Sequence, residues 1–224
     1  MSIRASGQSK IVSIVAGGVL SRRFLPSIRA ASVIIGVDRG ALWLMDNGVT
    51  PDVAIGDFDS VTATQKRRIH NGVHKYIEHP PEKDVTDLEL ASEEVIPMRP
   101  SEVRIYGATG KRFDHAMGAI HVLQKLASHN IYGVIVDNFN KIYIVRRLLV
   151  LSGEPGFRYV SVIPIHKNAI LSLAGFAYNV SRRTFAVGST LGISNEIIDD
   201  YATITVHSGV ILVIQSKDTC ESIG

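Results

Sequence analysis

The sequence contains very little cysteine. A single residue, Cys220, is present among 224, which excludes an internal disulfide framework and a zinc site built from several cysteines. The chain also lacks an apolar run of the roughly 20 residues that a membrane-spanning helix needs. Residues 11–20 are apolar, but they are rich in β-branched side chains and have no small-x-small cleavage pattern, so they favour a buried strand over a secretion signal. We therefore expect a cytoplasmic protein without a membrane partner.

The charge of the chain is also small, with a formal net value of +3. A hydrophobic content of 46% and a charged content of 20% are typical of a globular protein. Basic side chains are spread along the sequence, whereas nucleic-acid binding needs them in one stripe. We expect no nucleic-acid partner, and a mildly positive field that attracts anionic substrates. The basic groups are Arg22 and Arg23, Arg146 and Arg147, Arg182 and Arg183, and the cluster at residues 66–68.

The first part of the chain alternates short β-branched runs with helical patterns, which predicts a mostly parallel, Rossmann-like α/β sheet with helices on both faces. The clearest helix has an expected buried face with three- and four-residue spacing, although one of its members is polar: Met117, Ile120, Leu123, Gln124 and Ala127. The predicted strands are residues 11–15, 33–37, 53–55, 102–106 and 134–136, and the predicted helices are residues 40–47, 63–71, 85–96 and 114–128.

Beyond about residue 138 the pattern changes to short strands separated by glycine. Residues 203–206 and 210–213, joined through Ser208 and Gly209, have the pattern of a hairpin. We expect an α/β domain at residues 1–138 and an antiparallel β-sandwich at residues 139–224. The strands predicted in this second domain are residues 142–145, 148–151, 159–163, 169–173, 203–206 and 210–214.

Two acids, Asp57 and Asp59, follow the third predicted strand. If the loop is extended, their side chains point the same way, and two like charges ~4 Å apart repel by roughly 4 kcal/mol at an effective dielectric constant of ~20. Such a pair requires protons, basic side chains or a metal to offset the charge. Alone, the pair suits a magnesium site or a phosphatase nucleophile.

Other polar residues are predicted at the same edge of the sheet, where open parallel sheets bind ligands. Asp38 follows the second strand, residues 107–115 follow the fifth, and Asp84 and Asp87 lie at the start of a helix. N-cap or turn roles explain Asp38, Asp84 and Asp114 as well. The helix start after the glycine loop suits a phosphate. Its residues Gly107, Gly110, Lys111 and Arg112 supply close backbone donors and positive charge but do not form a Walker A loop.

These motifs resemble those of the thiamine pyrophosphokinase family, and the resemblance covers essentially the whole chain. In order, the motifs are residues 38–40 (Asp-Arg-Gly), 56–60 (Gly-Asp-Phe-Asp-Ser), 84–89 (Asp-Val-Thr-Asp-Leu-Glu), 107–115 (Gly-Ala-Thr-Gly-Lys-Arg-Phe-Asp-His) and 192–196 (Gly-Ile-Ser-Asn-Glu). Two positions depart from the family pattern, Lys111 in the glycine loop and the stretch at residues 176–178.

The resemblance implies transfer of a pyrophosphoryl group from ATP to the hydroxyl of thiamine, giving thiamine diphosphate and AMP. It implies a homodimer with a shared active site, and a β-sandwich that binds thiamine through Ser194 and Asn195. It also implies that Asp57 and Asp59 hold Mg²⁺, joined by Asp84 or Asp87. Nucleotide and phosphate binding then belongs to Asp38, Gly40, Gly107, Gly110, Lys111, Arg112 and Asp114.

The chemistry of the residues agrees with this reading, because pyrophosphoryl transfer needs positioning and charge neutralisation more than a nucleophile. For the proton of the thiamine hydroxyl we favour Asp87 or Asp84 over His115 as acceptor. Two alternatives stay open. One is an aspartyl-phosphate phosphatase that uses Asp57 as nucleophile, and the other is a non-catalytic thiamine or nucleotide sensor.

Overall fold

The computed structural model describes residues 10–218 except 81, 83, 154 and 155, so Cys220 lies outside the described residues. The chain divides into two compact units, residues 1–133 and residues 134–224. The domain boundary predicted from the sequence lies after residue 138, a few residues further along the chain. In the described part, no helix combines the length and the apolar character needed to cross a membrane.

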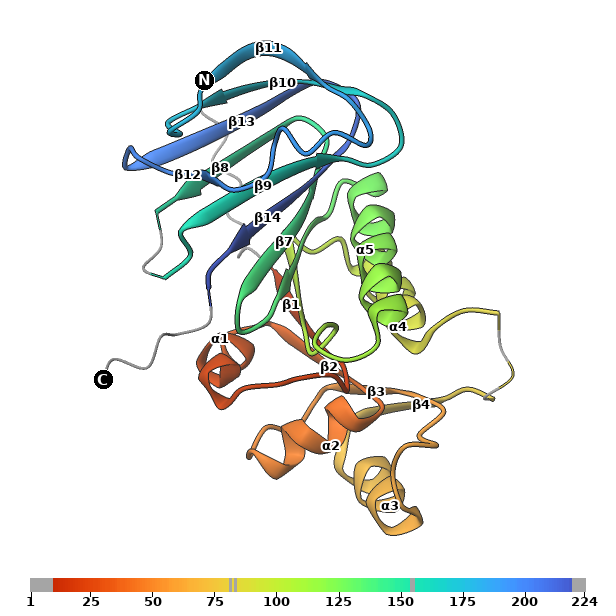
Figure 1. Cartoon of the computed structure of the whole chain (residues 1–224). Coiled ribbons are helices and arrows are strands. Elements are labelled where there is room, and N and C mark those ends of the chain that lie inside the picture. Colours follow the sequence, from red (N-terminus) through yellow and green to blue (C-terminus); the bar gives the residue numbers. More distant parts are fainter. Residues whose placement is uncertain (1–9, 81, 83, 154–155, 219–224) are drawn as a thin grey trace, which may run out of the picture. The chain divides into compact units, whose positions relative to one another are not determined.

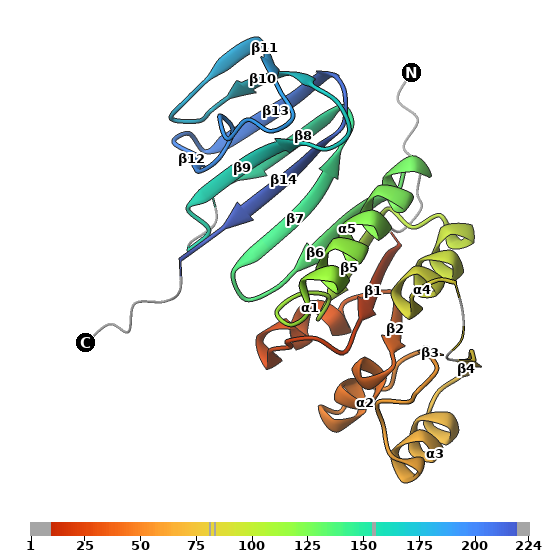
Figure 2. The ribbon, with the colours of Figure 1, turned by 45° about the vertical axis from the view of Figure 1, so that its right-hand side comes forward.

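The first unit is built around five parallel strands in the order β5-β1-β2-β3-β4. Figures 1 and 2 show α1, α2 and α3 on one side of these strands and α4 and α5 on the other. The strands are β1 (Ile11–Val15), β2 (Val33–Val37), β3 (Val53–Gly56), β4 (Lys75–Glu78) and β5 (Glu102–Tyr106). The helices are η1 (Arg22–Phe24), α1 (Leu25–Arg29), α2 (Arg39–Asp46), α3 (Ala63–Gly72), α4 (Asp87–Val95), η2 (Ile96–Met98) and α5 (Phe113–Ser128).

Burial on both faces explains why the central strands of this sheet were predictable. Ile14 and Ile35 are fully buried, and their strands read as continuous apolar runs. The sequence did not indicate β4, α1 or η1. β4 is a four-residue edge strand with exposed ends, and α1 is a five-residue helix with a proline in its first turn.

The predicted face of α5 is displaced from the observed one. The helix exists, but its buried residues are Ala119, Val122, Leu123 and Leu126, whereas Met117 is 40% exposed. Burial is therefore set by the surface of α5 that packs against the rest of the unit. This surface is adjacent to the face predicted from the residue spacing and shares Leu123 with it.

The second unit consists of two antiparallel sheets that enclose a common apolar core. One sheet has the order β12-β9-β14-β7-β6, and the other has the order β11-β10-β13-β8. The strands are β6 (Tyr132–Val136), β7 (Asn140–Val145), β8 (Leu148–Ser152), β9 (Tyr159–Pro164), β10 (Ala169–Ala174), β11 (Val180–Phe185), β12 (Asn195–Glu196), β13 (Tyr201–Ser208) and β14 (Ile211–Ser216).

The predicted hairpin of residues 203–206 and 210–213 is wrong. β13 pairs with β10 and β8, whereas β14 pairs with β7 and β9, so the short connection crosses from one sheet to the other. Both strands bury alternate side chains in the same core, which an alternating pattern cannot distinguish from a paired hairpin. β11 and the two-residue β12 were also not predicted, and β11 is a polar edge strand.

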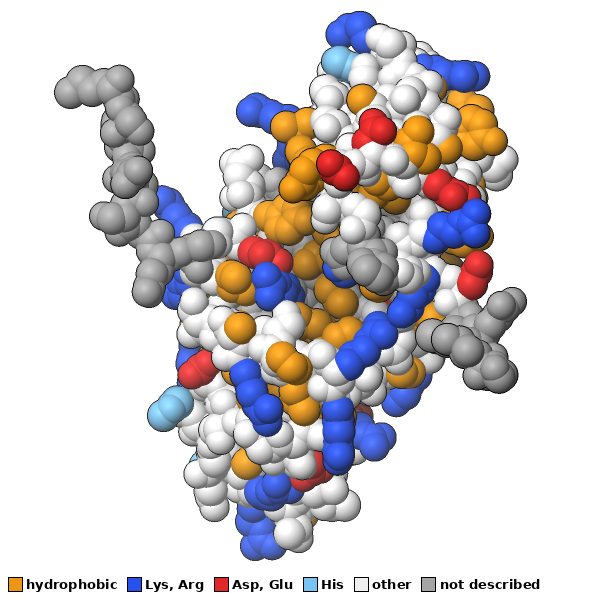
Figure 3. Space-filling view, turned by 90° about the vertical axis from the view of Figure 1, so that its left-hand side faces the viewer, with side chains coloured by type: hydrophobic (Ala, Val, Ile, Leu, Met, Phe, Trp, Pro, Cys, Tyr) orange, Lys and Arg blue, Asp and Glu red, His pale blue; other side chains and the backbone are white. Residues whose placement is uncertain are grey.

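Basic side chains do not gather in one continuous stripe on the face shown in Figure 3, where they are interspersed with polar and apolar groups.

Candidate active site

A cavity of about 560 Å³ opens at the carboxyl ends of the parallel strands. The chain runs from β1 outward to β4 and then returns to place β5 on the other side of β1. The crevice at such a reversal is the usual ligand site of an open α/β sheet. The cavity is lined by Ala16, Gly17, Gly18, Val37, Asp38, Arg39, Ser60, Thr86, Asp87, Leu88, Gly107, Ala108, Thr109, Lys111, Arg112, Asp114, His115, Gly118 and Ala119.

The loops after β1 and β5 lie against each other at this cavity. Gly18 donates its backbone N–H to the Gly107 carbonyl at 2.7 Å, and Val19 donates to Thr109 at 3.2 Å. A Cβ atom on Gly18 would lie 2.3 Å from the Gly107 oxygen, so the close approach of the two loops requires glycine there. The loop after β1 was not among the predicted site residues, although its Gly17-Gly18 pair, close behind a buried strand, indicated a close approach of the backbone.

Three acids from three different elements meet beside this cavity, and two of them, Asp38 and Asp87, line it. Asp38 precedes α2, Asp57 follows β3, and Asp87 begins α4. Each offers a carboxylate oxygen, and these oxygens lie within 4.8 Å of one another. Because parallel strands end at the same edge, acids 19 to 49 residues apart in sequence converge without any local motif.

The backbone of the β3 loop fixes two of these acids. The Phe58 N–H donates to Asp38 Oδ1 at 3.2 Å, and the Asp59 N–H donates to Asp57 Oδ1 at 3.1 Å. Gly56 leaves the space that the Asp38 carboxylate occupies, since a Cβ atom at that position would lie 1.8 Å from Asp38 Oδ1. The loop therefore holds Asp38 and Asp57 through short-range contacts of its own backbone.

Burial and the neighbouring acids raise the pKa of Asp38 from 3.8 to about 7. Loss of solvent is the largest cause, followed by the charge of Asp87; the Phe58 hydrogen bond lowers the pKa, and Asp57 raises it further. A half-buried carboxyl with this environment is poised to accept either a proton or a cation.

The three acids fit a magnesium ion in donor type and spacing. Mg²⁺ binds oxygen ligands at about 2.1 Å in octahedral geometry, which places ligand oxygens about 3 to 4 Å apart. Carboxylate oxygens within 4.8 Å of one another reach this spacing by small side-chain movements. The remaining positions are free for water or substrate oxygens, as is usual for this ion.

Asp59 and Asp84 do not belong to this group of three. Both side chains are exposed. The expectation of an extended Asp57–Asp59 loop is wrong, because Phe58 between them has a left-handed φ of 56°. The predicted helix start at residue 85 also shifts, since Thr86 is the N-cap of α4 and accepts from the Glu89 N–H at 3.3 Å. Asp84 is therefore not a helix cap.

Among the residues predicted to bind phosphate, Gly107, Lys111, Arg112 and Asp114 line the same cavity, whereas Gly110 does not. Lys111 Nζ donates to the Gly17 carbonyl at 3.3 Å, and Arg112 Nε donates to Asp114 Oδ1 at 3.1 Å. The Arg112 hydrogen bond holds the pKa of Asp114 below its usual value. Gly40 does not line the cavity but packs α2 onto β1, since a Cβ atom there would meet the Val15 oxygen at 1.9 Å.

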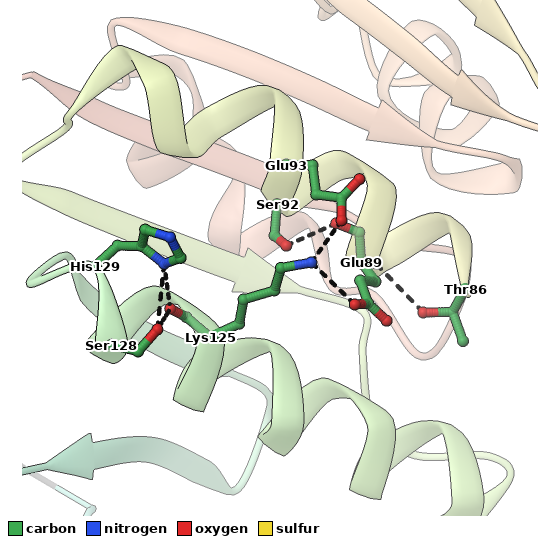
Figure 4. A network of polar contacts seen from close by, with 7 residues as sticks. All are labelled: Thr86, Glu89, Ser92, Glu93, Lys125, Ser128 and His129. Atoms are coloured by element: carbon green, nitrogen blue, oxygen red, sulfur yellow. Dashed lines mark hydrogen bonds and ion pairs between the residues drawn. The ribbon is translucent and has the colours of Figure 1, made fainter. Parts of the chain in front are cut away.

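The helices α4 and α5, whose N-terminal ends line the cavity, are joined by the ion-pair network shown in Figure 4. Lys125 on α5 contacts Glu89 at 2.9 Å and Glu93 at 2.6 Å, both on α4. The two glutamates are four residues apart and therefore share one face of the helix. Asp87 and the loop before α5 thus belong to helices that are tied to each other.

In the second unit, Asn195 is 7% exposed and acts within the fold. Its Oδ1 accepts from the Tyr178 N–H at 3.0 Å and its Nδ2 donates to the Tyr178 carbonyl at 2.9 Å. Ser194 is exposed, has a left-handed φ of 58°, and donates its N–H to Ser161 Oγ at 3.1 Å. Asn195 therefore shapes the loop at residues 176–179, in which Phe176 is buried and Tyr178 is 75% exposed, whereas Ser194 contacts β9.

Comparison with known proteins gives matches along most of the chain. A family model described as "Thiamin pyrophosphokinase, catalytic domain" matches residues 24–135, and one described as "Thiamin pyrophosphokinase, vitamin B1 binding domain" matches residues 148–211. Thiamine pyrophosphokinase of Bacillus subtilis (strain 168) is 35% identical over 215 residues, which cover 93% of this chain and 100% of that protein.

Solved structures give the same result. The crystal structure of the Bacillus subtilis thiamine pyrophosphokinase has a TM-score of 0.85 and covers 94% of this chain and 100% of its own. The thiamin pyrophosphokinase of Geobacillus thermodenitrificans has a TM-score of 0.84 at 31% identity, with 94% and 99% coverage.

The two matched models define the class of the protein, a transferase with a catalytic domain and a vitamin B1-binding domain. The chain belongs to the thiamine pyrophosphokinase family, and it is an enzyme of thiamine diphosphate biosynthesis. The family assignment sets aside the phosphatase and the non-catalytic sensor.

The raised pKa of Asp38 predicts a pH-dependent cost to stability. Between pH values of about 4 and 7 the folded protein keeps a proton that the unfolded chain releases, so stability falls as pH rises through this window. The penalty is at most about 1.4 kcal/mol per pH unit. Asp38→Asn removes it, so we expect the variant to gain stability over the metal-free wild type at pH 8 and much less at pH 5.

Urea unfolding of both proteins in EDTA at the two pH values measures this difference. Asp59→Asn, an exposed acid in the same loop, is the matched control and should show little change between them. An equal effect of Asp38→Asn at pH 5 and pH 8 would contradict the assignment.

Proposed function

We propose that the enzyme transfers the β,γ-pyrophosphoryl group of ATP to the hydroxyethyl oxygen of thiamine in the cavity of the first unit, with Mg²⁺ as cofactor. The observation that carries the proposal is that Asp57 meets Asp38 and Asp87, which line one cavity together with the glycine loop and its residues Lys111 and Arg112. The volume of about 560 Å³ falls within the usual range for small-molecule sites, about 300 to 1,000 Å³.

In this proposal Asp38, Asp57 and Asp87 hold the magnesium ion. The ion supplies neutralisation of the charge on the transferred phosphates. The metal-binding role that the sequence predicted for Asp59 and Asp84 stays a hypothesis. Their exposure and their place outside the group of three favour a minor role.

The glycine loop after β5 is proposed to bind the phosphates of ATP. Gly107 and Gly110 both have positive φ values, of 67° and 92°, so no side chain blocks backbone N–H donors from the ligand. Lys111 and the forked guanidinium of Arg112 add charge-assisted donors. The start of α5, a 16-residue helix, directs its positive end toward the same place.

The proposed reaction forms a bond between the thiamine oxygen and the β-phosphorus and breaks the bond between that phosphorus and the bridging oxygen of AMP. The hydroxyl proton passes to a carboxylate, for which Asp87 and Asp84 are the candidates. Thiamine binding is assigned to the second unit through Ser194 and Asn195. Support comes from the vitamin B1-binding model that spans both residues.

Incubation of the protein with ATP, Mg²⁺ and thiamine tests the reaction type. We expect thiamine diphosphate and AMP in equal amounts, measured by chromatography of both products. Formation of ADP, or of free phosphate without thiamine diphosphate, would overturn the proposal. Omission of Mg²⁺ should abolish turnover.

A series of isosteric variants tests which acids act on the metal. We expect Asp57→Asn and Asp87→Asn to lose about 10²-fold or more in kcat/KM, about 3 kcal/mol of transition-state stabilisation. Asp59→Asn is the matched control and should lose less than about tenfold. A loss in Asp59→Asn comparable to those of Asp57→Asn and Asp87→Asn would return the metal role to Asp59.

The family resemblance also leads us to propose a cytoplasmic homodimer that shares its active site. Exposed apolar side chains on β8, Leu148 at 60% and Val150 at 54%, support the presence of a partner surface. Light scattering during gel filtration should give about twice the 24.4 kDa chain mass. A monomeric mass in an active preparation would exclude the shared site.

A further inference from the structure

Phe58 is the apolar residue between the acids of the β3 loop, and it is almost completely buried. Its exposed fraction is 2%, and it packs in a cluster with Ala41, Leu42, Ala54 and Ile69. The residues on both sides of it, Asp57 and Asp59, are polar. Burial of this one side chain therefore inserts the loop into the core beneath α2 and α3.

Phe58 also connects two members of the acid group. It is the chain neighbour of Asp57, and its backbone N–H donates to Asp38 Oδ1 at 3.2 Å. Its φ of 56° is left-handed, which costs roughly 1 kcal/mol or more for a residue with a side chain. Such a conformation persists only when surrounding contacts determine it.

Tyr76 makes the most specific of these contacts. The Phe58 and Tyr76 rings are stacked, with centroids 4.8 Å apart and planes 18° apart. Tyr76 lies on β4, opposite Ala54 of β3 in the parallel register. A stacked aromatic pair contributes about 0.5 to 1.5 kcal/mol beyond burial, comparable to the cost of the backbone conformation it opposes.

The Tyr76 ring is itself held from several directions. Its hydroxyl donates to Glu78 Oε2 at 3.0 Å, and Lys66 Nζ contacts Glu78 Oε1 at 2.6 Å. The ring of His70 on α3 meets it edge-on, with centroids 4.8 Å apart. These contacts fix the position of the Tyr76 ring, and the stack in turn restricts where the Phe58 ring can lie.

We propose that Tyr76 is a positioning residue for the metal group: its stack on Phe58 holds the β3 loop in the left-handed conformation that places Asp57 and Asp38 together. The inference rests on the proposed function, because it assigns Asp38, Asp57 and Asp87 to one cation. Tyr76 itself donates no ligand, so its effect is on the geometry of the carboxylates. Mutation of residues that orient metal ligands typically lowers metal affinity about 10- to 100-fold.

Replacement of the ring tests this role. We expect Tyr76→Leu to bind Mn²⁺, measured as free ion by electron paramagnetic resonance, about tenfold more weakly than wild type. Tyr76→Phe keeps the stack and should remain within about threefold. In turnover, Tyr76→Leu should raise the Mg²⁺ concentration required for half-maximal rate far more than it lowers the rate at saturating Mg²⁺.

Two controls separate positioning from general stability. Lys66→Met breaks the neighbouring ion pair with Glu78 but leaves both stacked rings in place, and its effect on Mn²⁺ affinity should stay within the threefold range expected for Tyr76→Phe. In an Asp57→Asn background, Tyr76→Leu should weaken Mn²⁺ binding by a smaller factor than in the wild type, because Asp38 alone remains of the two ligands that it positions. If Tyr76→Leu does not fold, Tyr76→Met, which keeps a large apolar side chain without a ring, takes its place.

The possible outcomes are distinct. Wild-type affinity in Tyr76→Leu, or an equal loss in Tyr76→Phe, overturns the positioning role. Wild-type protein that binds Mn²⁺ but makes no thiamine diphosphate overturns the proposed function, while the comparison of the two Tyr76 variants still decides the inference. Wild-type protein that binds no Mn²⁺ overturns both.

Discussion

The site depends on one unfavourable interaction, the mutual repulsion of three carboxylates brought within 4.8 Å of one another. Burial first, and then the charges of Asp87 and Asp57, raise the pKa of Asp38 to about 7. No single local motif brings these acids together. They lie at the ends of β2 and β3 and at the start of α4. The packing of these three elements in the first unit therefore keeps the acids close together.

The order of the strands explains why acids and phosphate-binding groups share one cavity. β1 lies between β2, whose end carries Asp38, and β5, whose end carries the glycine loop. The loops after β1 and β5 approach so closely that Gly18 and Gly107 must both lack side chains. The reversal of strand order at β1 therefore places a negative and a positive side on either side of one crevice.

Sequence patterns predicted the strands and the convergence of polar loops because buried parallel strands are continuous apolar runs with fixed ends. They did not predict which acids meet. Asp59 is two residues from Asp57, but the left-handed backbone at Phe58 separates their directions, and that conformation depends on a stack with Tyr76 of β4. β4 itself is too short and too exposed to have a clear pattern. The wrong hairpin has a similar origin, since pairing of β13 and β14 is decided by the sheets that receive them.

The same features give the site its stability cost and its expected function. A rigid loop, with Phe58 buried and Gly56 cleared for the Asp38 carboxylate, prevents the acids from relaxing apart. The folded protein without a cation therefore retains the repulsion as a loss of stability. A cation that binds recovers that free energy, because the ligands need little reorganisation. The fixed positions of the three carboxylates therefore both prepare the site for a cation and lower the stability of the protein when no cation is bound.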